Sequence, residues 1–112
     1  MKTGVAIAAL SALSHEVRLQ AFRELVQAGP SGLSVGELRD RLAIPPATLS
    51  AYLNTLRASE LVADTREGRV IRVRANFERM DALLGYLTEN CCGGAPCGPA
   101  GRRRATRKGS KP

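Results

Sequence analysis

Aromatic side chains and histidine are scarce in this chain of 112 residues. There is no Trp, and there are two Tyr, two Phe and one His. The hydrophobic core must therefore consist of aliphatic side chains, a composition that suits packed helices. The cysteines have no histidine or paired carboxylates nearby to act as a base, so we expect no enzyme activity.

Long apolar runs are also missing. No stretch approaches the roughly 20 residues needed to cross a bilayer. The segment GVAIAALSALSHEVRL has no signal-peptide cleavage context before charged residues resume. We therefore expect a cytoplasmic protein with no membrane partner. A chain of this length buries about two thirds of its unfolded surface, which supports one compact domain.

Acidic residues are absent from the C-terminal segment. Residues 1–101 contain 11 Lys and Arg against 10 Asp and Glu, whereas residues 102–112 contain six basic residues and no acidic one. This segment, RRRATRKGSKP, has no large apolar side chain to stabilise an ordered conformation. We expect a disordered basic tail that either keeps the protein soluble or binds phosphate weakly.

Apolar residues at helical spacing predict two helices in the first 28 residues. The first covers about residues 5–12. Ser14 is placed to cap the second, which Gly29 and Pro30 end. His15 lies at the start of the second helix and is interpreted as a capping or surface residue.

The next two helices resemble a helix-turn-helix unit, in which the second helix, here called the reader helix, recognises DNA. Ser34 and Glu37 form a capping box for a short helix, and Pro45 and Pro46 end it and begin another. The core stripe of this fourth helix is Leu49, Leu53 and Leu56. Its outward set is small and polar: Thr48, Ser50, Ala51, Asn54, Thr55 and Arg57. Short hydrogen-bonding side chains near the start of a second helix suit recognition in the major groove.

A β-hairpin is predicted after the reader. Strands at 61–65 and 69–74 flank a turn that contains Gly68, and Ile71 and Val73 share one face. A basic hairpin after a reader helix is a wing, although an ordinary solvated ribbon is the alternative. The predicted phosphate contacts are Arg66, Arg69, Arg72 and Arg74.

The last predicted helix covers residues 77–91, with Asn76 as its cap. Its wide apolar stripe consists of Phe77, Met80, Leu83, Leu84 and Leu87. So many aliphatic residues on a terminal helix require a partner. Met80 is interpreted as part of the core, not as a metal ligand.

All three cysteines, Cys91, Cys92 and Cys97, lie in the single short stretch ENCCGGAPC. Three cysteines cannot all pair within one chain, and a reducing cytosol disfavours structural disulfides. The cluster therefore indicates metal, metalloid or redox chemistry.

The order of elements resembles the ArsR family of metalloid- and metal-responsive winged-helix repressors. The motifs that carry this resemblance are LSHEVRLQAFRELV, ATLSAYLNTLRASELV and REGRVIRVR. It implies a mainly α fold with a β-hairpin wing, and a homodimer that binds double-stranded operator DNA until an inducer releases it. We expect the first and last helices to form the dimer seam, with Leu10, Leu83, Leu84 and Leu87 as its main residues.

Two stretches depart from the familiar family pattern. Arsenic-responsive relatives often have cysteines where this chain reads LSVGEL, and relatives commonly have histidines where it has Ala51 and Tyr52. We still expect Ala51 and Tyr52 to bind DNA. The full predicted DNA-binding set is Thr48, Ser50, Ala51, Tyr52, Asn54, Arg57, Arg66, Arg69 and Arg72. The element ENCCGGAPC resembles the relocated site of a subgroup that senses arsenic(III) or antimony(III) with a vicinal cysteine pair and a later cysteine.

Three thiolates match the chemistry of trivalent arsenic or antimony, which is soft and pyramidal. Gly93, Gly94 and Pro96 would let the chain turn so that Cys97 approaches the pair. Zinc held by the three thiols and water is an alternative, as is a thiol-redox switch. A DNA-binding protein whose cysteines serve no inducer also remains open. We expect no organic cofactor.

Three segments follow from these observations. Residues 1–92 form the DNA-binding and dimerisation domain, residues 93–101 form the inducer-binding turn together with Cys91 and Cys92, and residues 102–112 form the basic tail.

Overall fold

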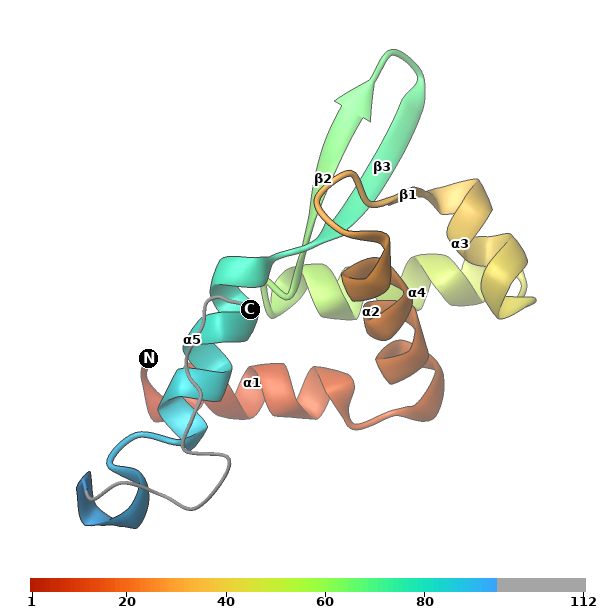
Figure 1. Cartoon of the computed structure of the whole chain (residues 1–112). Coiled ribbons are helices and arrows are strands. Elements are labelled where there is room, and N and C mark those ends of the chain that lie inside the picture. The colour runs from red at the N-terminus through yellow and green to blue at the C-terminus, as the bar shows by residue number, and fades with distance from the viewer. Residues whose placement is uncertain (95–112) are drawn as a thin grey trace.

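The computed structural model describes residues 1–94, so Cys97, most of the predicted 93–101 turn and the tail at 102–112 lie outside the described residues. Within residues 1–94 the fold is mainly helical with an antiparallel hairpin, which confirms the predicted winged helix-turn-helix (Figure 1). The elements are α1 (Thr3–Leu13), α2 (Glu16–Ala28), β1 (Leu33–Ser34), α3 (Val35–Leu42), α4 (Pro46–Ala58), β2 (Val62–Glu67), β3 (Val70–Ala75), α5 (Phe77–Leu87) and a 3-10 turn (Cys91–Gly94).

The boundary between α1 and α2 differs from the prediction by one residue. His15 is the N-cap of α2, and its Nδ1 accepts hydrogen bonds from the backbone N–H groups of Val17 at 3.2 Å and Arg18 at 3.4 Å. Ser14 instead ends α1, where its N–H donates to the carbonyl of Ser11. The predicted cap at Ser14 is wrong, and the capping role of His15 is confirmed.

The sheet contains a strand that the sequence pattern did not reveal. β1 is only two residues long and pairs with β3, so the strand order is β1-β3-β2. Leu33 lies opposite Val73, and Val62 lies opposite Ala75. The hairpin turn between β2 and β3 is Gly68-Arg69, with Gly68 at φ +61°, and the hairpin projects from the helical body (Figure 1).

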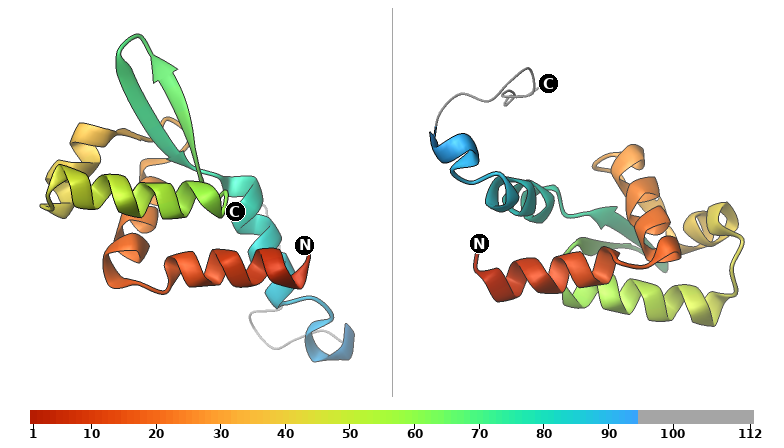
Figure 2. Two further views of the ribbon diagram at one scale, coloured as in Figure 1. Left: turned by 180° about the vertical axis from the view of Figure 1, so that it is seen from behind. Right: turned by 90° about the horizontal axis from the view of Figure 1, so that it is seen from below.

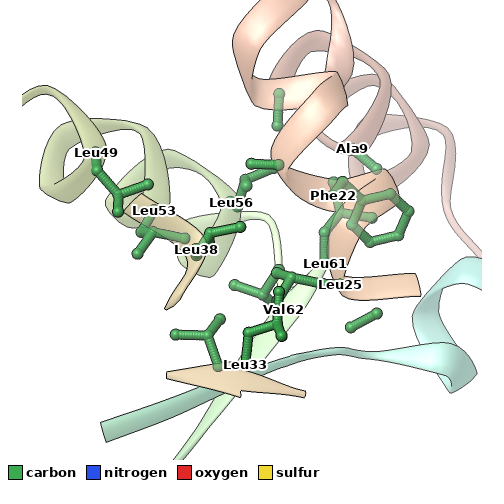
Figure 3. Close-up of a cluster of buried hydrophobic side chains, with 14 of the residues drawn as sticks. Ala9, Phe22, Leu25, Leu33, Leu38, Leu49, Leu53, Leu56, Leu61 and Val62 are labelled. Carbon is green, nitrogen blue, oxygen red and sulfur yellow. The ribbon is translucent and has the colours of Figure 1, made fainter. Parts of the chain in front are cut away.

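The core lies where α2, α3 and α4 meet the base of the sheet (Figure 3). Its largest fully buried side chains are Leu25, Leu38, Leu49, Leu53, Leu56, Leu61 and Val73. The predicted leucine stripe of α4 is thus confirmed. α1 contributes only small buried residues, Ala6, Ala9 and Ala12, which allow a close approach between helices.

α5 begins as predicted but ends earlier. The Asn76 side chain caps it by accepting from the N–H of Arg79 at 3.2 Å. The helix ends at Leu87 and not at residue 91, and the Thr88 hydroxyl donates to the carbonyl of Leu84 at 2.9 Å. α1 and α5 are adjacent (Figure 2). The hydroxyls of Thr3 and Tyr86 form a hydrogen bond of 2.7 Å between the two helices.

Candidate DNA-binding face and cysteine site

The face of α4 opposite its leucine stripe is open to solvent. Ser50, Ala51, Asn54 and Thr55 are exposed, and Thr48 is half-buried. The Thr55 hydroxyl donates to the carbonyl of Ala51 at 3.3 Å. This face therefore presents a small hydroxyl, a methyl group and an amide, which are suited to contacts with base edges.

Tyr52 is half-buried and packs against the N-terminus of α2. Its ring centroid lies 4.7 Å from that of His15, and the Arg18 guanidinium lies 5.8 Å from the Tyr52 ring centroid. Arg18 also donates through Nε to the carbonyl of Ala12 at 2.7 Å. The aromatic ring of Tyr52 thus joins α4 to α2, in addition to any contact it makes with DNA.

The four wing arginines do not form a single patch. The strand register puts Arg66 on the same face as Ile71 and Val73, whereas Arg72 and Arg74 lie on the opposite face. Arg69 lies in the turn. Arg66, Arg69 and Arg74 are exposed, so these three guanidinium groups remain placed for phosphate contacts.

Arg72 has partners within the fold. Its guanidinium donates to the carbonyls of Ser31 at 3.0 Å and Gly32 at 3.1 Å, and one nitrogen lies 3.8 Å from a carboxylate oxygen of Glu37. Those carbonyls belong to the loop between α2 and β1. The side chain therefore holds this loop against β3, a role that the sequence alone did not reveal.

The predicted capping box at the start of α3 is present. The Ser34 N–H donates to Glu37 Oε1 at 2.8 Å, and the Glu37 N–H donates to the Ser34 hydroxyl at 3.1 Å. The backbone hydrogen bond from Ser34 is the main cause that lowers the pKa of the Glu37 carboxyl below its ordinary value of 4.5, and Arg72 and Arg41 lower it further.

The vicinal cysteines lie beyond the end of α5 in a turn of left-handed residues. Asn90, Cys92 and Gly93 have φ values of +55°, +59° and +66°. Both cysteines are exposed, and their sulfur atoms lie 3.6 Å apart. On a regular helix adjacent side chains point about 100° apart, so leaving the helix is what brings the two sulfurs together.

The structure describes two of the three thiols in the predicted metalloid site, those of Cys91 and Cys92. In residues 1–94 there is no group of three or more His, Cys, Asp or Glu placed to hold a metal ion. Cys97, the predicted third ligand, lies outside these residues. Thiol sulfurs are soft donors, the kind of ligand that soft ions select in proteins.

Apolar side chains are exposed on α1 and α5. Leu10 is 42% exposed, and Leu84 and Leu87 are each 54% exposed. Leu83 is only 5% exposed, because it packs in the core of its own chain. Of the four predicted seam residues, three therefore present an apolar surface. No helix in the described part of the chain is long and apolar enough to span a membrane.

Comparisons with known proteins agree with this architecture. A family described as "Helix-turn-helix domain" matches residues 13–65. The chain is 32% identical to the transcriptional repressor BigR from Xylella fastidiosa, covering 76% of this chain and 85% of that one, with a TM-score of 0.58. It is 27% identical to an ArsR-like transcriptional regulator from Rhodococcus sp. RHA1, covering 81% and 82% of the two chains, with a TM-score of 0.69. It is also 28% identical to the nodulation protein NolR from Rhizobium meliloti over 85 residues, which are 76% of this chain and 67% of that protein.

Proposed function

Since the chain belongs to the ArsR family of winged helix-turn-helix transcriptional regulators, we propose that it is a metalloid-responsive repressor. It binds operator DNA as a homodimer and is released when arsenic(III) or antimony(III) binds its C-terminal cysteines. The observation that carries this proposal is the 3.6 Å separation of the Cys91 and Cys92 sulfurs on an exposed turn.

DNA binding is assigned to α4 and the hairpin. Ser50, Ala51 and Asn54 face the base edges, while Arg66 and Arg69 contact the phosphate backbone on either side. Two such helices in a homodimer lie about one duplex turn apart on a pseudo-palindromic site.

Dimerisation is assigned to α1 and α5. The exposed leucines Leu10, Leu84 and Leu87 supply apolar surface there, and apolar surface is stabilised by removal from water. The cysteine turn immediately follows α5, so a ligand bound at the turn acts directly on the end of a dimer helix.

The inducer site uses three thiolates on one atom. Cys91 and Cys92 supply two sulfurs that are already neighbours, and Cys97 supplies the third. Trivalent arsenic has a stereochemically active lone pair and is satisfied by three soft donors. The neutral product needs no counter-charge.

Inducer binding is coupled to DNA binding through contacts at the N-terminal end of α5. The Asn76 N–H donates to the carbonyl of Leu61 at 2.8 Å, Asn76 Nδ2 donates to the carbonyl of Glu60 at 3.0 Å, and Arg79 pairs with Glu60 at 3.1 Å. These contacts join the first turn of α5 to the chain just after α4. An inducer that stabilises one dimer conformation by about 1–3 kcal/mol therefore changes the relative orientation of the two α4 helices.

The test is release of DNA from the full-length protein. The probe is a duplex that the protein selects from a randomised pool, and the titrants are arsenite, antimonite and a methylated arsenical. We expect at least one of them to release the DNA at a concentration at which zinc and a thiol oxidant do not. Release by zinc or by oxidant alone would instead assign the cysteines to zinc-responsive or thiol-redox-responsive regulation.

A further inference from the structure

Arg57 lies in the last turn of α4, and its guanidinium holds two partners at once. Nε lies 3.1 Å from both carboxylate oxygens of Asp64, and Nη1 donates to the side-chain oxygen of Asn54 at 3.0 Å. The side chains of Arg57 and Asp64 are 31% and 37% exposed. The pair is therefore partly shielded from solvent, and it joins α4 of the candidate DNA-binding face to β2 of the wing.

The two partners belong to different parts of that face. Asn54 is one turn earlier on α4, whereas Asp64 is on β2, the first strand of the wing. A guanidinium is planar and its donors have fixed directions, so binding in two directions fixes the angle between its partners. Arg57 thus ties the wing to the reader helix at a defined orientation.

The same contact fixes the orientation of the Asn54 amide. A guanidinium has donors and no acceptor, so the amide atom that faces Arg57 must be the oxygen. The amide nitrogen, with its two donors, then points away from Arg57. Because Asn54 is exposed, these donors belong to the surface that α4 offers to a base edge.

We propose that Arg57 is a positioning residue for operator recognition: it aims the Asn54 amide and sets the wing against the reader. It does not act as a phosphate contact. The inference rests on DNA binding through α4, which the proposed function also requires, but it is independent of the identity of the inducer.

Asp64 separates this proposal from a purely electrostatic role. A carboxylate beside a DNA-binding surface repels phosphate, so its removal strengthens DNA binding if charge alone matters. If the carboxylate holds Arg57 in position, its removal weakens the preference for operator over random DNA. Charge alone therefore predicts tighter binding to both duplexes with an unchanged ratio, whereas the positioning role predicts a lower ratio of operator to random affinity.

The experiment measures affinity for the selected duplex and for random duplex at several salt concentrations, without inducer. The variants of the full chain are Asp64→Ala and Arg57→Lys, the latter keeping the positive charge but losing the planar fork. We expect each to lower the ratio of operator to random affinity about fivefold or more, the lower end of what one oriented base contact contributes. The salt dependence of random binding should be unchanged in Arg57→Lys, whereas Arg66→Ala should reduce its slope by about one.

Glu24→Ala is the matched control. It removes another exposed ion pair, Arg41 with Glu24 at 3.0 Å, which joins α2 to α3. Its thermal stability should fall about as much as that of Asp64→Ala, while its operator preference stays at the parent value. The proposal is overturned if Asp64→Ala or Arg57→Lys keeps the parent preference. If Ser50→Ala also keeps that preference, α4 is not the reader, and the failure belongs to the proposed function.

Discussion

The backbone of Gly32 lies directly against the carbonyl group of Val73. A Cβ atom at position 32 would overlap this carbonyl, and Gly32 also has a φ of +66°, which other residues rarely adopt. This close approach lets the next residue, Leu33, pair with Val73 in the sheet. Glycine is therefore required at position 32 for both space and backbone conformation.

Gly32→Ala should destabilise the protein by about 2–4 kcal/mol, because the overlap with backbone adds to the cost of the left-handed conformation. Gly68→Ala is the matched control. Gly68 has nearly the same φ, +61°, but no atom lies within 4 Å of the position its Cβ would take. Denaturant unfolding should show a cost of about 1 kcal/mol for the control. Equal costs for the two variants would contradict the close approach.

The capping box predicts a pH dependence of stability. The pKa of Glu37 is lowered in the folded state, so its contribution is present above the ordinary value of 4.5 and is lost as the pH falls below it. Glu37→Gln keeps an acceptor for the Ser34 N–H but does not titrate. Between pH 7 and about pH 3 the difference in melting temperature between parent and variant should therefore be largest at neutral pH and should shrink as the pH falls below 4.5. A constant difference across this range would argue against the shifted carboxyl.

Local signals in the sequence predicted most of the fold. The leucine stripe of α4, the Ser34–Glu37 capping box and the Gly68 turn each depend on residues within a few positions of one another. β1 was missed because two residues have no periodicity, and its strand character comes only from pairing with β3. The N-cap of α2 was misplaced by one residue because Ser14 and His15 both have an acceptor suited to capping.

The site was harder to predict because it depends on distant partners. Arg72 looked like a phosphate contact, yet it binds carbonyls about 40 positions earlier in the chain. Arg57 looked like part of the outward set, yet Asp64 on the wing holds it. No pattern along the chain reveals which guanidinium groups the fold itself occupies. The adjacent cysteines were visible, but the closeness of their sulfurs required the left-handed turn.

The hydroxyls near the start of α4 should contribute to operator preference. Thr48→Ala and Ser50→Ala each remove a hydroxyl, and each should reduce specific binding by up to about 1–3 kcal/mol. Thr55→Ala is the control, because that hydroxyl already donates to the carbonyl of Ala51. Affinity for the selected duplex and for random DNA measures the effect. If both variants keep the parent preference, the reader has been misplaced.

The basic tail should affect non-specific binding only. Deleting residues 102–112 removes six positive charges and no negative one. Affinity for random DNA and its salt dependence should fall, because each phosphate neutralised contributes about 0.9 to the slope. Operator preference and release by inducer should remain. Loss of all DNA binding on truncation would show that the tail has a further role.

The last prediction separates the three thiols. Cys97→Ser leaves the vicinal pair, whose sulfurs are 3.6 Å apart, so a methylated arsenical with two exchangeable positions should still release the DNA. In the proposed site inorganic arsenite and antimonite bind all three thiolates, so the loss of one donor should raise the concentration needed for release at least about tenfold, equivalent to about 1.4 kcal/mol. Cys91→Ser and Cys92→Ser should lose the response to all three compounds.

All three cysteine variants should still bind operator with the parent affinity, because Cys91 and Cys92 lie beyond α5 and outside the core, and Cys97 follows them in the chain. The expected phenotype is therefore a repressor that cannot be induced, and not an inactive one. Release of the selected duplex against each compound measures this directly. If Cys91→Ser or Cys92→Ser is released by inorganic arsenite at the concentration that releases the parent, the vicinal pair is not the inducer site. A zinc or redox role for the cysteines would then become the better explanation.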